Sequence, residues 1–154
     1  MIDTPEIIET EPRLCAVIHL HIPKDAIRKE MGPGIAELRA AVEAQGIAAP
    51  GAWFTHHSKM DPAFWDFEIG VPVTKPVKPV GRVTGGELPA RRVARTTYRG
   101  GYEGLGDGWG ELMQWIEKSG HRAAPDLWEI YAVGPESGSE PGKWQTELYR
   151  PLLP

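Results

Sequence analysis

The pattern of apolar and polar positions predicts two helices among six β-strands. Helical spacing is clearest over residues 106–120, where apolar side chains recur every three or four residues and Gly120 supplies a left-handed stop. Residues 32–46 follow the same pattern up to Gly46. Strands are predicted for six apolar, β-branched or aromatic runs: 14–22, 52–58, 65–73, 90–98, 127–133 and 144–152. The pattern therefore predicts an α+β protein.

The two helical segments also share their sequence. Glycine, glutamate, leucine, glutamate and glycine coincide between residues 32–46 and 106–120 at a constant offset of 74, and "APGAW" matches "APDLW" at an offset of 75. We infer a duplication, with one repeat at about 14–74, a linker at about 75–89 and a second repeat at about 90–152. Each repeat has the order strand, helix, strand, strand. The predicted fold is a single domain over 1–154, with pseudo-twofold symmetry, helices on one face of an antiparallel sheet and a central ligand cleft.

The repeat also predicts which way the tryptophans face. Trp53 and Trp128 occupy matched positions, so we expect both to pack under the helices, on the opposite side of their strands from Phe54 and Glu129. Trp109 lies on the helical stripe and is expected in the core.

Composition and charge narrow the function classes. The chain has 154 residues, with 21 acidic and 17 basic side chains, and this net charge of -4 favours neither nucleic acid nor an anionic membrane as a direct partner. It has no signal-peptide pattern and no apolar run long enough to span a membrane. Its single cysteine, Cys15, lies in an apolar run and is expected to be buried. These features favour a cytoplasmic protein, as a monomer or homodimer.

No cofactor or metal motif stands out. The chain lacks a phosphate loop, a dinucleotide fingerprint and paired cysteines. Four histidines lie on predicted strands, His19, His21, His56 and His57, and three of their imidazoles could meet across strands. Because no carboxylate or cysteine stands at a characteristic metal spacing from them, we expect exposed or core histidines, with no metal and no cofactor.

The order of motifs in the second half resembles the GyrI-like family, the effector-binding domain of AraC- and MerR-type regulators. The matching segments are "RGGY", the helix that follows it, "LWEIY" and "ELYRPL", and "FEIGVPV" in the first half also fits the family pattern. The resemblance implies a cleft that binds bulky, planar, often cationic organic compounds, with a buried glutamate at Glu129 and a tyrosine at Tyr102. Because the first repeat begins near Leu14, we expect the binding module alone, without a helix-turn-helix.

Strand facing adds further residues to the predicted site. Side chains alternate along a strand, so Tyr131 shares the face of Glu129, and Phe54 and His56 share the corresponding face of the first repeat. Trp65 and Trp144, near the starts of the third strands, are further candidates for the lining. A carboxylate among aromatic rings is costly to desolvate and is favourably paired when a cation enters, and each ring adds about 0.5–2 kcal/mol of cation–π attraction.

Three functions fit these residues. The first is a small-molecule-binding protein for multidrug sensing or sequestration. The second, implied by the resemblance, is a hydrolase that opens cyclopropane-bearing DNA-alkylating natural products, with Glu129 and Tyr102 as catalytic residues and Glu129 activating or orienting water. The third, also implied by the resemblance, is inhibition of DNA gyrase.

Overall fold

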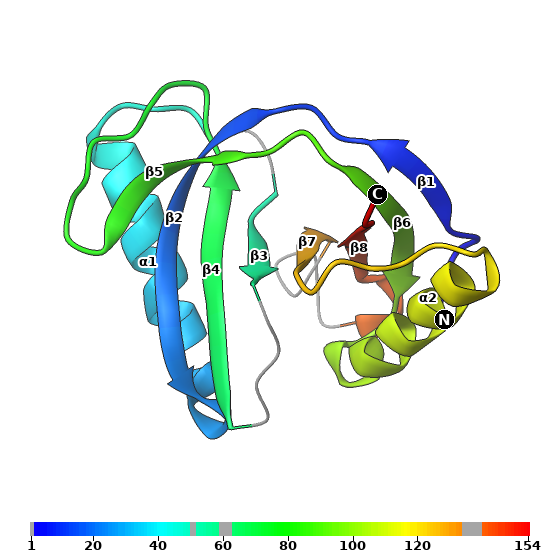
Figure 1. Ribbon diagram of the computed structural model, residues 1–154. Coiled ribbons are helices and arrows are strands. Elements are labelled where there is room, and N and C mark those ends of the chain that lie inside the picture. The colour runs from blue at the N-terminus through cyan, green and yellow to red at the C-terminus, as the bar shows by residue number, and fades with distance from the viewer. Residues whose placement is uncertain (1, 50–51, 59–62, 134–139) are drawn as a thin grey trace. The chain divides into compact units, whose positions relative to one another are not determined.

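The computed structural model describes residues 2–49, 52–58, 63–133 and 140–154 (Figure 1). The chain divides into two compact units. Unit 1 combines Met1–Thr10 with Arg91–Pro154, and unit 2 is the continuous stretch Glu11–Ala90. Unit 1 is therefore built from both ends of the chain.

Unit 2 is an antiparallel sheet with one long helix. Its elements are β2 (Arg13–Pro23), the 3-10 turn η1 (Lys24–Ala26), α1 (Ile27–Ala44), β3 (Phe54–His57), β4 (Phe64–Pro72) and β5 (Val83–Leu88). The strand order is β3-β4-β2-β5. The side chains that α1 covers form one apolar core, which includes Ile18, Leu20, Phe67 and Ile69 from the sheet and Leu38 and Val42 from the helix. Helix α1 lies along β2 and β4 in Figure 1.

Within the described residues, unit 1 also has four strands and one α-helix. Its elements are β1 (Glu6–Glu9), β6 (Arg92–Arg99), the 3-10 turn η2 (Tyr102–Gly104), α2 (Leu105–Lys118), β7 (Leu127–Val133), the 3-10 turn η4 (Pro141–Lys143) and β8 (Gln145–Pro151). The strands are antiparallel in the order β1-β6-β8-β7. Its core joins Leu112 and Ile116 of α2 to Ala94, Tyr98 and Leu148 of the sheet.

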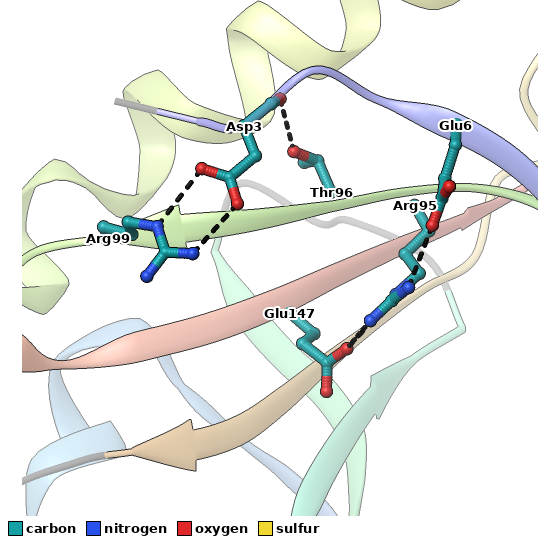
Figure 2. Close-up of polar contacts among 6 residues, drawn as sticks. All are labelled: Asp3, Glu6, Arg95, Thr96, Arg99 and Glu147. Atoms are coloured by element: carbon teal, nitrogen blue, oxygen red, sulfur yellow. Dashed lines mark hydrogen bonds and ion pairs between the residues drawn. The ribbon is translucent and has the colours of Figure 1, made fainter.

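The N-terminal segment is fastened to unit 1 by backbone pairing and by ion pairs. Strand β1 pairs with β6, and Arg95 bridges Glu6 at 2.9 Å and Glu147 of β8 at 2.6 Å (Figure 2). Arg99 donates to both carboxylate oxygens of Asp3, at 3.2 and 3.1 Å. Exposed ion pairs such as Asp3–Arg99 add little because solvent screens them, so we assign most of the attachment to the β ladder and to Ile2 and Ile7, which pack on the core.

Most of the predicted elements are present, and the α+β class is confirmed. All six predicted strands and both helices occur, and Gly46 and Gly120 have the positive φ of left-handed stops, 66° and 79°. Three features differ from the prediction. Strand β5 lies inside the predicted linker, β1 was not predicted, and α1 begins five residues earlier than expected and contains Pro33. The duplication, its symmetry and a cleft between the repeats stay predictions.

The predicted facing is right for Trp53 and wrong for Trp128. Trp53 packs on the core that α1 covers, as expected. Trp128 pairs across the ladder with Tyr149, whereas its neighbour Glu129 pairs with Leu148, which lies under α2. Glu129 therefore faces the helix and Trp128 faces the other side. Side chains alternate along a strand, so a matched position that differs by one residue in facing turns every side chain of the strand to the opposite face.

No helix within the described residues is long and apolar enough to cross a membrane. Cys15 is buried, as predicted, and burial raises the pKa of its thiol to about 11. Within the described ranges, no three His, Cys, Asp or Glu side chains are arranged to hold a metal ion.

Candidate functional site

The position of Glu129 follows from the register of unit 1. Glu129 lies directly opposite Leu148 on β8, and Tyr131 lies opposite Thr146. Residues that are directly opposite in an antiparallel pair point to the same face, and Leu148 packs in the core with α2. The side chains of Glu129 and Tyr131 therefore lie on the helix-covered face of the sheet.

Two hydrogen bonds hold the carboxylate. The indole Nε1–H of Trp109, on α2, donates to Oε2 of Glu129 at 2.6 Å. The hydroxyl of Tyr131, two residues along β7, donates to Oε1 at 2.7 Å. Both oxygens thus have a neutral donor, and the described residues place no cation in hydrogen-bond contact with them.

Burial raises the pKa of Glu129 above its usual range. Desolvation is the largest cause, and the hydrogen bonds from Trp109 and Tyr131 lower the pKa by smaller amounts. Neutral donors stabilise the carboxylate without neutralising its charge, so part of the cost of burying that charge remains. A cation placed beside the carboxylate would offset this cost.

Aromatic rings extend outward from the carboxylate. The ring of Tyr102, in η2, meets that of Tyr131 edge to face at 5.9 Å and that of Trp144 at 5.1 Å. Trp144 precedes β8. We call Trp109, Glu129, Tyr131, Tyr102 and Trp144 the Glu129 cluster, and all five belong to unit 1. It contains four of the residues predicted from the sequence, and the roles of those residues in binding stay predictions.

Glycines at the start of α2 allow the helix to approach the sheet closely enough for Trp109 to reach Glu129. The Tyr98 hydroxyl donates to the carbonyl of Gly101 at 2.8 Å, and a Cβ on Gly104 would overlap that hydroxyl. A Cβ on Gly108 would lie 2.8 Å from Cδ1 of Tyr98. The glycine-rich run before and within α2 thus fits around a buried tyrosine.

The three remaining predicted residues belong to unit 2. Phe54 is buried with its ring against Gly70, where a Cβ would overlap it. His56 is half-buried and contacts a carboxylate oxygen of Glu68 at 3.4 Å. Trp65 packs on the core of unit 2 and contacts Lys24 and His57.

Sequence reasoning missed the contact between Trp109 and the carboxylate. The helical stripe correctly placed Trp109 against the core, where the residue packs. However, the indole N–H is a donor that needs a partner when it is buried, and Glu129 is that partner. The requirement of a buried tryptophan for an acceptor was the available signal, but the predicted facing of Glu129 away from the helix concealed it.

Aromatic side chains around a few fixed polar groups are the usual lining of sites that bind organic small molecules. The model of the GyrI-like small molecule binding domain matches residues 3–153, and the chain belongs to this family. The family resemblance inferred from the sequence is therefore confirmed. No curated protein sequence matches the chain significantly.

Solved structures share the fold at low sequence identity. The C-terminal domain of EcmrR is 21% identical, with 97% of each chain covered and a TM-score of 0.85. In the EcmrR–DNA complex the match covers 57% of the EcmrR chain, so this chain spans little more than half of that protein. A hydrolase from Listeria innocua is 15% identical, with 97% of this chain and 91% of that chain covered and a TM-score of 0.68. SAV2435, bound to tetraphenylphosphonium, is 9% identical, with 98% and 94% covered and a TM-score of 0.64.

Proposed function

We propose that the protein captures hydrophobic organic compounds, and planar or bulky cations in particular, at the Glu129 cluster, for multidrug sensing or sequestration. The observation that carries the proposal is the bonding of Glu129, whose carboxylate is half-buried beside aromatic rings and held by two neutral donors. The related fold of SAV2435 binds tetraphenylphosphonium, a lipophilic cation, which supports this ligand class.

The chemistry selects for charge as well as for shape. A lipophilic cation gives up little hydration when it enters an apolar site, and it gains the attraction of the carboxylate and of the aromatic faces. An anion of the same shape gains the apolar contacts but is repelled by Glu129. The site should therefore discriminate between two ligands that differ only in the sign of their charge.

Tetraphenylphosphonium and tetraphenylborate form such a pair. We expect the cation to bind in the micromolar range and the anion to bind at least tenfold more weakly, a difference of about 1.4 kcal/mol or more. Isothermal titration calorimetry of both ligands at neutral pH measures this ratio. Equal affinity for the two ions would show that the site selects shape alone, and the role proposed for Glu129 would then be abandoned.

Hydrolysis is the second candidate, favoured by the direction of the Glu129 pKa. A carboxylate whose pKa is raised by burial is a better general base near neutral pH, because it takes a proton more readily from an attacking water. Water would then add across a strained cyclopropane carbon–carbon bond. Incubation with a cyclopropane-bearing DNA-alkylating natural product, followed by mass spectrometry, tests this candidate. A product heavier by one water supports it, and unchanged compound that remains bound supports capture alone.

A further inference from the structure

A second carboxylate lies at the exposed end of the Glu129 cluster. Glu103 follows Tyr102 in η2, and its side chain is exposed. Its carboxylate turns back over the backbone of Gly101, where a Cβ would lie 2.5 Å from Oε2 and 2.7 Å from Oε1. Because Gly101 has no side chain, the carboxylate can lie beside the start of the turn that carries the Tyr102 ring.

The same end of the cluster holds Trp144. The backbone N–H of Gly100 donates to the carbonyl of Trp144 at 3.1 Å, so the glycines before η2 lie beside the residue before β8. The rings of Trp144 and Tyr102 are 5.1 Å apart, and both side chains are half-buried. Glu103 is therefore next to a partly exposed aromatic pair, which a ligand can contact without entering the core.

The two carboxylates stand at opposite ends of a short aromatic wall. Tyr131 donates to Glu129 at 2.7 Å, and its ring meets that of Tyr102, the residue before Glu103. Glu129 is half-buried, whereas Glu103 is exposed. Within the described residues, Glu103 forms no ion pair. Each end of the wall thus carries an acidic group that no cationic side chain of the described residues neutralises.

This arrangement is complementary to an elongated ligand with a cation at each end. One cation pairs with the carboxylate of Glu129, and the apolar middle of the ligand lies along the tyrosine rings. The other cation remains in water beside Glu103, so placing it there costs little desolvation. Its attraction to an exposed carboxylate is small and is screened by salt. A ligand with a single cation gains only the first of these two attractions.

We propose that the Glu129 cluster prefers lipophilic dications to monocations, and that Glu103 determines this preference. The inference rests on the capture of cations proposed for Glu129, and it names a narrower class of ligand for the same site. Glu103 attracts the second cation of the ligand and has little influence on the first.

The test compares hexamethylene-bis(triphenylphosphonium), a dication, with hexyltriphenylphosphonium, a monocation that has the same alkyl chain. Glu103→Gln keeps the shape of the side chain and removes its charge, so it should weaken dication binding about three- to fivefold, or about 0.6–1 kcal/mol, in calorimetry. Monocation binding should change by less than about 1.5-fold. Comparing the two proteins with each compound cancels the extra apolar contacts of the dication and its two equivalent ends.

A matched variant and the salt concentration separate a local charge from other causes. Glu111→Gln removes the same charge at an exposed position on α2 and should change neither affinity. The effect of Glu103→Gln on the dication should shrink as sodium chloride is raised from about 0.05 to 0.5 M, because salt screens an exposed pair.

The outcomes distinguish this inference from the proposed function. The inference alone is overturned if the wild type binds the monocation but Glu103→Gln weakens both compounds equally or neither of them. It is also overturned if Glu111→Gln has the same effect, or if the loss does not depend on salt. Binding of neither compound by the wild type would overturn both the inference and the capture of cations at Glu129.

Discussion

Replacing Glu129 with glutamine is expected to weaken tetraphenylphosphonium binding at least tenfold. The amide has nearly the shape of the carboxylate, and its oxygen can still accept from Trp109 while its NH₂ group donates to the Tyr131 hydroxyl. The substitution thus removes the charge and keeps the packing. The affinity of the wild-type protein should also rise with pH as Glu129 ionises, above the ordinary range for a glutamate, and the affinity of the variant should not.

The same substitution should stabilise the protein in the absence of ligand. Since the pKa of Glu129 is raised in the folded state, folding favours the protonated form. The stability that this group provides is complete below its unfolded pKa, near 4.5, and is lost as the pH rises from there through the folded pKa. At neutral pH the glutamine variant has no buried carboxylate charge and therefore lacks this cost. We expect its free energy of unfolding to be about 0.5–2 kcal/mol higher than that of the wild type, as measured by denaturant unfolding.

Glu147→Gln is the matched control, because it removes one negative charge from the neighbouring strand. Glu147 pairs with Arg95 and lies opposite Ile130 on the other face of the sheet, away from the Glu129 cluster. It should leave cation affinity within about twofold of the wild type, a difference below 0.5 kcal/mol. A similar loss of affinity in both variants would indicate that the net charge of the protein attracts the cation, rather than the carboxylate of Glu129.

The second large effect is expected from a change in how α2 packs against the sheet. Gly104→Ala should destabilise the protein by about 1–3 kcal/mol, because the added methyl group overlaps the buried hydroxyl of Tyr98 and forces either the ring or the helix to move. The displacement should weaken tetraphenylphosphonium binding as well, since Trp109, five residues along, donates to Glu129 from the same helix. Thermal unfolding and calorimetry measure the two effects.

A double substitution separates steric overlap from a general glycine effect. In a Tyr98→Phe background the hydroxyl that the methyl group would overlap is absent, so Gly104→Ala should cost at least about 1 kcal/mol less than it does in the wild type. Gly106→Ala, where a Cβ would meet no atom within 4 Å, should be neutral or stabilising by up to about 1 kcal/mol. Equal costs for Gly104→Ala in both backgrounds would contradict the proposed overlap.

Much of the fold could be predicted from periodicity alone. Apolar patterns mark β7, β4 and α2, because each of these elements buries one face against the core of its own unit. Strands β1 and β5 lack such a pattern. Strand β1 has charged residues at both of its ends, and β5 includes Gly85 and Gly86. Both are defined by their pairing with a distant strand, which local sequence does not encode.

The candidate site was predicted in composition but not in geometry. Glu129, Tyr131, Tyr102 and Trp144 were identified and do lie together. A hydrogen bond links Glu129 to Tyr131, and ring contacts link Tyr131 to Tyr102 and Tyr102 to Trp144. The face on which Glu129 lies was assigned wrongly, because Trp128 was expected to face its helix as Trp53 does, whereas Glu129 shares the face of Leu148 under α2. Without the correct face, no sequence argument could bring Trp109 to the carboxylate.

The division of the chain into units has a consequence for synthesis on the ribosome. Unit 2 is continuous, so all of its strands are available once residue 90 has emerged. In unit 1, strand β1 is synthesised first but pairs with β6, which follows the whole of unit 2 in the sequence. Strand β6 in turn pairs with β8, which is synthesised last. The half that holds Glu129 is therefore the last to be completed. A truncation of the first ten residues would remove a strand from that half, although unit 2 is the nearer in sequence.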